Sequence, residues 1–411
     1  MSDTNRVDGL AALLKVRGRP SAPSRWAPTT KPGVFRVQVA RTTHPDDKSP
    51  ESAVTERSSR FLAIDALRGF AALAVVVYHI HGAFERAPQP WMPEWLASVF
   101  STGHFGVNIF FVLSGFVIAY SLRSAKLSGR FIGQFTLRRS IRLDPSLWVA
   151  IALEALLVWV SLRFFPGVGS ADMPTLPQMA ANAVYLPEFL GYAYVSPVLW
   201  TLCYEIQYYL TFVTLLVLAH AIGQRFSPPV GQRLLAVVLV ALFVASLAAR
   251  QHLLPGLPKG LALERWSEFF CGVLTFWVVS GRAPRWLMGC AVVVLAGNAA
   301  VTGNYSEPLV TLSTAAMCAM SFLRPSTNRF FDHAALQWMG LISYSLYLFH
   351  ASVGYRTVSL GQHLLGKTLS PVTGPLLWIV SLAVAIGVSA ILWRLVERPS
   401  HALSRRIAMN G

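Results

Sequence analysis

Arg68 and His79 are the first residues whose types and spacing could serve a reaction. They lie eleven positions apart in an apolar stretch. A helix would place them within about 20° of each other and about 16 Å apart along its axis. Histidine suits a general base because its ordinary pKa is near neutrality. His81 would point about 200° away from that face, so its substitution should be nearly silent. The alternative for His79 is a histidine that packs between helices and bonds a carbonyl.

A carboxylate forms a second candidate group, in the segment 200–209 at the start of a later apolar stretch. Trp200 and Glu205 stand in this segment, and Tyr209 follows the glutamate by one helical turn. Glu205 could orient or stabilise a histidine, or it could bind the hydroxyl groups of a sugar. It could equally be a hydrogen-bond partner between helices.

Three arginines, Arg138, Arg139 and Arg142, are clustered in the segment 137–145. We expect this segment to be a loop before the third apolar stretch. Guanidinium groups bind phosphate through paired, charge-assisted hydrogen bonds, so the cluster is a candidate site for a phosphorylated substrate. The same composition is typical of a basic anchor on the cytoplasmic side of a membrane.

Further polar side chains interrupt apolar stretches. Tyr344, Tyr347 and His350 form a stripe at helical spacing that could contact a substrate, although an aromatic belt at a membrane interface would look similar. Glu154 and Glu268 are ionisable groups in apolar surroundings, and each needs a partner or a function.

The cysteines indicate neither a metal site nor a disulfide framework. All four lie inside apolar runs, without CxxC spacing or a nearby Cys/His cluster: Cys203, Cys271, Cys290 and Cys318. We expect buried thiols and no bound metal.

The elements that hold these residues are predicted to be membrane-spanning helices. The chain has 411 residues, of which 54% are apolar and only 13% charged, about half the charge of an ordinary soluble domain. Apolar stretches near 20 residues long recur from residue 61 onward. The ten expected spans are 63–83, 104–122, 145–165, 198–222, 232–249, 262–280, 284–301, 307–323, 341–359 and 373–395. The predicted fold is an all-α polytopic membrane protein.

The distribution of basic residues predicts the orientation. The net charge is +16, and most of the 35 Lys and Arg residues fall in alternate segments on one side of the expected spans. The positive-inside rule then puts both termini in the cytoplasm and the loop 166–197 outside. This placement also argues against nucleic-acid binding. Residues 1–60 are polar and Pro-rich and are expected to be a disordered cytoplasmic extension, and 401–411 a short cytoplasmic tail.

The ordered set of motifs resembles the acyltransferase-3 family of integral-membrane acyltransferases. Arg68 and His79 are similar to its Arg/Lys-x10-His pattern. The other matching segments are Phe110–Phe116, Arg138–Pro145, Trp200–Glu205, Glu268–Gly272, Ile342–His350 and Glu397–Pro399. The resemblance covers about 61–400. Asp144 stands where this family often has an aromatic residue, and Cys203 with Tyr204 replaces a common Ser-Val pair.

This resemblance implies an O-acyltransferase that moves an acyl group, by default acetyl, from cytoplasmic acyl-coenzyme A to a hydroxyl of a saccharide or glycosylated acceptor. His79 would be the general base, with Arg68 and Glu205 as the other catalytic residues. The implied substrate-binding residues are Arg138, Arg139, Arg142, Ser114, Trp200, Tyr347 and His350. Acyl-coenzyme A is then a co-substrate, with no bound cofactor, in a bacterial inner membrane.

A secondary transporter or flippase for a hydroxylated lipid or glycan is the alternative, because intramembrane His and Glu residues also serve proton relays. The arginine cluster and the Arg-x10-His order favour the enzyme, since a transporter has no particular need of them. The acyl group, the acceptor, the oligomeric state and the choice between direct transfer and an acyl-enzyme stay open.

Overall fold

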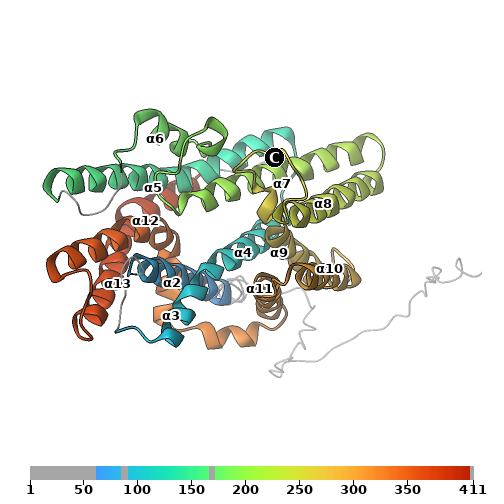
Figure 1. Cartoon of the computed structure of the whole chain (residues 1–411). Coiled ribbons are helices and arrows are strands. Elements are labelled where there is room, and N and C mark those ends of the chain that lie inside the picture. The colour runs from blue at the N-terminus through green and yellow to red at the C-terminus, as the bar shows by residue number, and fades with distance from the viewer. Residues whose placement is uncertain (1–61, 85–90, 166–171, 408–411) are drawn as a thin grey trace, which may run out of the picture. The chain divides into compact units, whose positions relative to one another are not determined.

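The computed structural model describes residues 62–84, 91–165 and 172–407, and this part of the chain contains helices and no strand. It belongs to one compact unit, residues 50–411. The predicted all-α class is therefore confirmed for the described residues (Figure 1). The expected extension 1–60 lies outside these ranges, as do residues 408–411 of the expected tail.

The helices follow one another along the chain in the order of their labels in Figure 1. The α-helices are α2 (Leu62–Phe84), α3 (Glu94–Ser101), α4 (Gly106–Ser121), α5 (Gly129–Phe164), α6 (Leu176–Ala183), α7 (Leu199–Arg225), α8 (Pro228–Arg250), α9 (Trp266–Val279), α10 (Trp286–Thr302), α11 (Ser306–Leu323), α12 (Ala334–Leu365), α13 (Thr373–Leu392) and α14 (Arg398–Ser404). Short 3-10 turns η1 (Thr102–Phe105), η2 (Glu188–Leu190), η3 (Ala262–Arg265) and η4 (Pro325–Phe331) connect some of them, and the π-helical turn η5 (Trp393–Glu397) joins α13 to α14.

Within the described residues, six helical segments are long and apolar enough to cross a membrane. They are Leu62–Phe84, Glu94–Ser121, Gly129–Phe164, Leu199–Arg225, Pro228–Arg250 and Thr373–Ser404. Helix α10 is apolar but shorter. Helix α12 is long enough, but its polar side chains lower its mean hydropathy. Every one of the ten expected stretches falls on helical structure, yet only six segments meet both conditions, so the count of ten spans stays a prediction.

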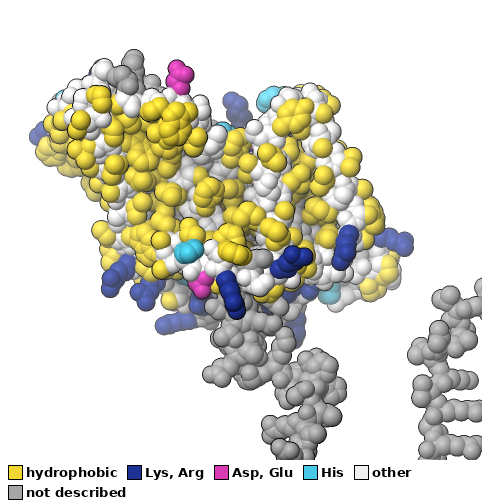
Figure 2. Space-filling view, turned by 90° about the horizontal axis from the view of Figure 1, so that it is seen from below, with side chains coloured by type: hydrophobic (Ala, Val, Ile, Leu, Met, Phe, Trp, Pro, Cys, Tyr) yellow, Lys and Arg dark blue, Asp and Glu magenta, His cyan; other side chains and the backbone are white. Residues whose placement is uncertain are grey.

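The surface is that of a multi-pass membrane protein. Hydrophobic side chains cover most of the face in Figure 2, and Lys and Arg side chains gather along its lower edge. Large apolar side chains are exposed on the long helices, among them Trp159 of α5, Val293 of α10 and Leu376 of α13. Such surfaces are unfavourable in water and stable against lipid tails.

The arginine segment is helical, which corrects the expected loop at 137–145. Helix α5 begins after Ser128, whose side chain accepts a hydrogen bond from the backbone N–H of Phe131 at 3.2 Å. It then continues through Pro145 to Phe164. A proline inside a helix removes one backbone hydrogen bond, but packing on both sides preserves this helix. The arginines are therefore held at fixed angles on a rigid element.

Two helix pairs approach closely where both members carry glycine. Helix α2 packs mainly against α12, and α4 against α9. In the first pair, a Cβ added to Gly340 would lie 2.2 Å from the carbonyl oxygen of Asp65. In the second, a Cβ on Gly115 would lie 1.9 Å from the Phe269 carbonyl oxygen, and one on Gly272 would lie 2.0 Å from that of Val112. Small residues let helix backbones approach in this way.

Gly115→Ala should destabilise the protein, although alanine favours a helix by about 1 kcal/mol over glycine. The added methyl group meets the backbone of α9, which cannot rotate aside as a side chain can, and overpacking of this kind costs about 1–3 kcal/mol. Thermal unfolding of the purified protein in detergent measures the effect. Gly297→Ala on α10 is the matched control, because no atom lies within 4 Å of its Cβ position, and it should be neutral or stabilising. Equal melting temperatures for the two variants would refute the tight contact.

Candidate active site

A cavity of about 110 Å³ lies between helices α2, α4, α5, α7 and α12. It contains basic and aromatic side chains together with one carboxylate. Its lining residues are Arg68, Val107, Phe110, Phe111, Leu113, Ser114, Val117, Arg139, Arg142, Leu143, Thr201, Leu202, Glu205, Tyr209, Tyr344 and Tyr347. Six of the residues expected at the site therefore line one cavity, although they come from five different helices.

The guanidinium groups of Arg68, Arg139 and Arg142 line this cavity and are available to a ligand. Within residues 62–84, 91–165 and 172–407, no hydrogen bond or ion pair holds any of the three. The guanidinium carbon of Arg139 lies 4.3 Å from the ring centre of Tyr209, a cation–π contact that fixes its position. Positive groups with unused donors attract anions, and phosphate groups above all.

Glu205 is held by two hydroxyl groups inside the cavity. Ser114 of α4 donates to its Oε1 at 2.7 Å, and Tyr209, one turn further along α7, donates to the same oxygen. The next residue after the serine, Gly115, makes the close contact with α9 described above. Ser114 therefore positions the carboxylate of Glu205, and Gly115 allows α4 to pack closely against α9.

His79 lies outside the cavity lining, towards the C-terminal end of α2. Its Nδ1 lies 2.6 Å from the hydroxyl oxygen of Tyr355, and its ring centre lies 5.1 Å from that of His350. Tyr347 connects this group to the cavity, since it lines the cavity and its ring centre lies 5.9 Å from that of His350. Thr201 donates to the Tyr347 hydroxyl at 2.8 Å.

His350 is in a fixed tautomer with an unused nitrogen. Its Nδ1 lies 2.9 Å from the carbonyl oxygen of Leu346, and because a carbonyl only accepts, Nδ1 carries the proton. Its Nε2 is fully buried and has no hydrogen-bond partner among the described residues. Unsatisfied buried polar atoms are rare in proteins and are found at catalytic or binding sites. Tyr347 and His350 are thus interior residues and do not form an aromatic belt.

Glu205 and His79 have different partners, so of the alternatives left open for Glu205 the geometry does not pair it with this histidine. The described side chain that hydrogen-bonds His79 is Tyr355, whereas Glu205 contacts Ser114 and Tyr209. The group that contacts Nδ1 of His79 is therefore the hydroxyl of Tyr355.

Arg138 and Trp200 do not line the cavity. Arg138 precedes Arg139 on α5 and points to another side of the helix. The Trp200 ring packs against Phe111, with ring centres 6.2 Å apart, and lies 6.0 Å from the guanidinium carbon of Arg265. Trp200 thus separates the cavity from a cluster of charged residues around Arg265.

His81 lies in packed protein, although helix geometry predicts that its substitution is nearly silent. It does face away from His79, but only 5% of its surface is exposed, and its ring centre lies 6.0 Å from that of Phe100. Both faces of α2 are covered by neighbouring elements, so turning away from the site still leads into packed protein. The silence of a His81 substitution stays a prediction, but its burial makes this residue a poor control.

Asp144 and Glu154 also have partners that explain their presence in an apolar helix. Tyr185, in the segment between α6 and α7, donates to Asp144 at 2.7 Å. Burial raises the pKa of Tyr185, and nearby Tyr344 and Asp144 raise it further, so its hydroxyl keeps the proton that it donates. Glu154 forms a two-pronged ion pair with Arg356, at 2.7 and 3.2 Å.

Sequence reasoning missed Tyr355 and the aromatic wall formed by Phe110 and Phe111. Tyr355 lies five residues after His350 on α12, and no spacing rule links it to a histidine on α2. No group of three or more His, Cys, Asp or Glu side chains suited to a metal ion occurs in the described part of the chain.

Comparison with known proteins places this geometry in a family. A family model described as an acyltransferase domain matches residues 61–394. Nodulation protein 10 from Rhizobium leguminosarum bv. viciae is 27% identical over 374 residues, which cover 82% of this chain and 93% of that protein. Acyltransferase MdmB from Streptomyces mycarofaciens is 27% identical over 376 residues, covering 85% of this chain and 94% of that protein.

A third relative is longer than this chain. Peptidoglycan O-acetyltransferase OatA from Listeria monocytogenes is 24% identical over 391 residues, covering 82% of this chain and 55% of that protein. No solved structure matches significantly. The family match covers the helices that carry both the arginine-lined cavity and the His79 group, so the chain belongs to the acyltransferase-3 family and is an O-acyltransferase.

Proposed function

We propose that the protein transfers an acyl group, by default acetyl, from cytoplasmic acyl-coenzyme A to a hydroxyl of a saccharide or glycosylated acceptor. The observation that carries this proposal is the cavity in which three arginines have no hydrogen-bond or ion-pair partner among the described residues. Coenzyme A carries phosphate groups, which suit such donors. A saccharide acceptor is supported by the relative named as a peptidoglycan O-acetyltransferase.

In the proposed reaction, His79 takes the proton of the acceptor hydroxyl. The hydroxyl oxygen forms a bond to the thioester carbonyl carbon, the carbon–sulfur bond breaks, and coenzyme A leaves as the thiol after receiving a proton. His79 can accept a proton at Nε2 when its Nδ1–H donates to the Tyr355 oxygen, which lies 2.6 Å away. Tyr355 would then select the reactive tautomer.

Arg68, Arg139 and Arg142 would bind the phosphate groups of the donor. Arg68 and His79 lie on the same helix with about 16 Å between them along the axis, which a long thioester entering from the arginine side can span. Glu205 and Ser114 would line the path of the donor or contact the acceptor.

The proposed orientation has ten spans with both termini in the cytoplasm of a bacterial inner membrane. The outer loop expected at 166–197 is described from residue 172. Ser170, a position in this loop that the sequence suggests for labelling, lies outside the described residues. Asp172→Cys should react with an impermeant maleimide in intact cells, because it is exposed at the start of the described part of this loop. Lys126→Cys, exposed before α5, should react only after the cells are opened. It is preferable to Ser128, which caps α5. The reverse pattern would contradict the orientation and the donor side together.

The function is tested by mass spectrometry of surface glycans from cells with and without the gene. Deletion should remove the mass of one acyl group from a glycan, and the wild-type gene should restore it. A gene that encodes the His79→Gln variant, expressed at the same protein level, should not restore the acyl group. Unchanged glycans, with a saccharide or lipid accumulating inside the cells, would instead support a transporter.

A further inference from the structure

A second pocket, of about 300 Å³, lies among η3 and helices α8, α9, α10 and α11. It is more polar than the cavity described above, and its lining does not include Arg68, Arg139 or Arg142. Its lining residues are Leu247, Arg250, Gln251, His252, Glu264, Arg265, Ser267, Glu268, Leu295, Asn298, Thr302, Asn304, Glu307, Pro308 and Thr311. Neither the family match nor the proposed reaction gives this pocket a role.

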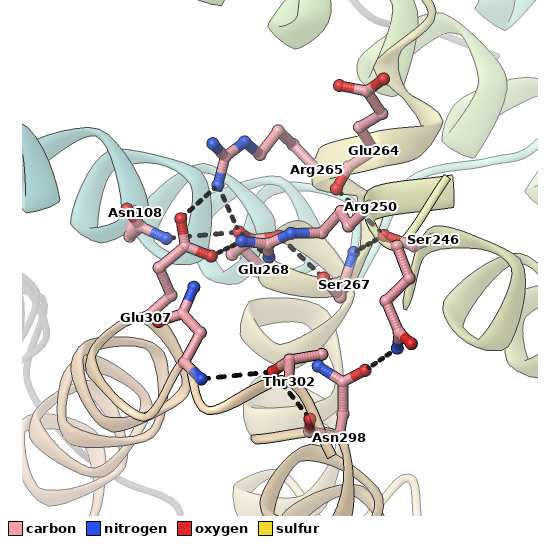
Figure 3. Close-up of polar contacts among 12 residues, drawn as sticks. Asn108, Ser246, Arg250, Glu264, Arg265, Ser267, Glu268, Asn298, Thr302 and Glu307 are labelled. Carbon is pink, nitrogen blue, oxygen red and sulfur yellow. Dashed lines mark hydrogen bonds and ion pairs between the residues drawn. The ribbon is translucent and has the colours of Figure 1, made fainter. Parts of the chain in front are cut away.

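The charged residues of the pocket form a closed network (Figure 3). Arg250 bonds Glu268 at 2.8 Å and also pairs with Glu307, while Arg265 lies 3.2 Å from each of the two carboxylates. Asn108 of α4 donates to Glu268 at 3.3 Å. Two positive and two negative charges therefore neutralise each other, and the network fixes the relative positions of four helices.

Several polar groups of the pocket can still form hydrogen bonds to a ligand. Within the described residues, Arg265 uses only Nη1 for both ion pairs, so Nε and Nη2 keep their protons to donate. Gln251 donates to the side-chain oxygen of Asn298 at 2.5 Å. This leaves the side-chain NH2 of Asn298 and the side-chain oxygen of Gln251 without a hydrogen-bond partner in the part of the chain that the structure describes. Figure 3 shows the Glu264 carboxylate pointing away from the network.

The pocket has no excess of positive charge. Its lining includes two arginines and three glutamates, Glu264, Glu268 and Glu307. A phosphate or carboxylate ligand is therefore disfavoured, in contrast to the arginine-lined cavity. A neutral ligand with many hydroxyl groups suits the mixture of donors and acceptors, since each hydroxyl both donates and accepts. His252 adopts a left-handed backbone, with φ of 57°, which is uncommon for residues other than glycine and occurs at functional sites.

The pocket and His79 lie at the same end of α4. Asn108, near the start of this helix, bonds Glu268 of the pocket. Gly103, just before α4, lies against Tyr78, the neighbour of His79, because a Cβ there would be 2.9 Å from the Cβ of Tyr78. Trp200 and Phe111 separate the pocket from the cavity. His79 does not line the pocket, so a sugar ring bound there is not the ring that reacts.

We infer that this pocket binds a neutral sugar ring of the acceptor, separate from the ring whose hydroxyl is acylated. The inference rests on the proposed function for the direction of transfer, and it narrows the acceptor to a neutral glycan of several rings. In the proposed orientation, the pocket opens on the outer face, where the surface glycans of a bacterium are found.

Protection from cysteine labelling tests the inference without any acyl transfer. Asn304 is exposed and lines the pocket, so Asn304→Cys provides a reporter in the full chain. Cys290 is exposed, which corrects the expectation of a buried thiol at this position, so it is first changed to serine. The probes are maltotetraose, cellotetraose and chitotetraose, with tetragalacturonic acid as the anionic counterpart. At ten times its Kd, a bound glycan should slow maleimide labelling about ten-fold. Ser370→Cys, exposed between α12 and α13 and outside the pocket, should label at an unchanged rate.

A second variant separates binding in the pocket from a general effect of sugar. Asn298→Leu removes a pocket amide without changing the ionic network and should abolish the protection. Val293→Leu, on the exposed opposite side of α10, should preserve it. Absence of protection by all neutral glycans, or stronger protection by the anionic one, would overturn the inference. Either result would leave the donor proposal standing, because that proposal fails separately if the arginine variants bind acyl-coenzyme A normally.

Discussion

His79→Gln should abolish acyl transfer while leaving a folded, membrane-inserted protein that still binds acyl-coenzyme A. Glutamine keeps a hydrogen-bonding group near Tyr355, which lies 2.6 Å from the histidine, but it cannot accept a proton at neutral pH. Loss of general-base catalysis lowers a rate by about 10²–10⁴. The measurement is the transfer rate of the purified variant at saturating donor, together with its affinity for acyl-coenzyme A.

The control for this variant is His220→Gln. His220 is exposed on α7 and hydrogen-bonds Gln224 on the same helix. Because it lines neither the cavity nor the His79 group, the substitution should leave the rate unchanged. His81 cannot serve, because it is buried and its replacement would disturb packing. A His79→Gln enzyme within a few-fold of the wild-type rate would move the base elsewhere. His350, whose buried Nε2 has no hydrogen-bond partner within the described ranges, is then the next candidate.

Arg139→Gln and Arg142→Gln should each raise the KM for acyl-coenzyme A with little change in kcat. Hydrogen bonds to charged groups contribute about 1.5–3 kcal/mol, and each 1.36 kcal/mol is a factor of ten, so each KM should rise about 10- to 150-fold. Both side chains line the cavity, and no hydrogen bond to a described residue is broken when either is replaced. The measurement is the transfer rate as a function of donor concentration.

Arg138→Gln is the matched control, since it removes the same charge from the adjacent position of α5 but not from the cavity lining. Its KM should stay close to that of the wild type. Equal increases for all three variants would indicate a diffuse electrostatic effect of the basic segment. No increase for any of them would mean that the cluster is only an anchor for membrane orientation.

Helix positions and several site residues could be predicted from the sequence because both depend on local patterns of residue type and spacing. Apolar length locates helices, and helical spacing puts Arg68 and His79 on one face of α2. The error at 137–145 came from Pro145, which often ends a helix but here lies inside α5. Local pattern could not decide this, because the packing that preserves the helix comes from elsewhere in the chain.

The partners of the charged and polar residues could not be predicted. The sequence indicated that Glu268 is an ionisable group in apolar surroundings. Its ion-pair network also includes Arg250 and Glu307, which belong to the helices before and after it, and the pairing depends on how those helices pack. Tyr355 meets His79 across 276 positions of sequence, and nothing local marks a tyrosine as a partner. Long-range pairs of this kind are consequences of the tertiary structure.

The separation of about 16 Å along α2 between Arg68 and His79 has a consequence for the energetics of transfer. In the proposed mechanism the phosphate groups stay at the arginines, and only the uncharged acyl end reaches the opposite half of α2. Moving one elementary charge through 100 mV involves about 2.3 kcal/mol. Because the phosphates do not move through the field, the membrane potential should neither drive nor oppose delivery of the acyl group. De-energised membranes supplied with acyl-coenzyme A on the cytoplasmic side should then support transfer as well as energised ones.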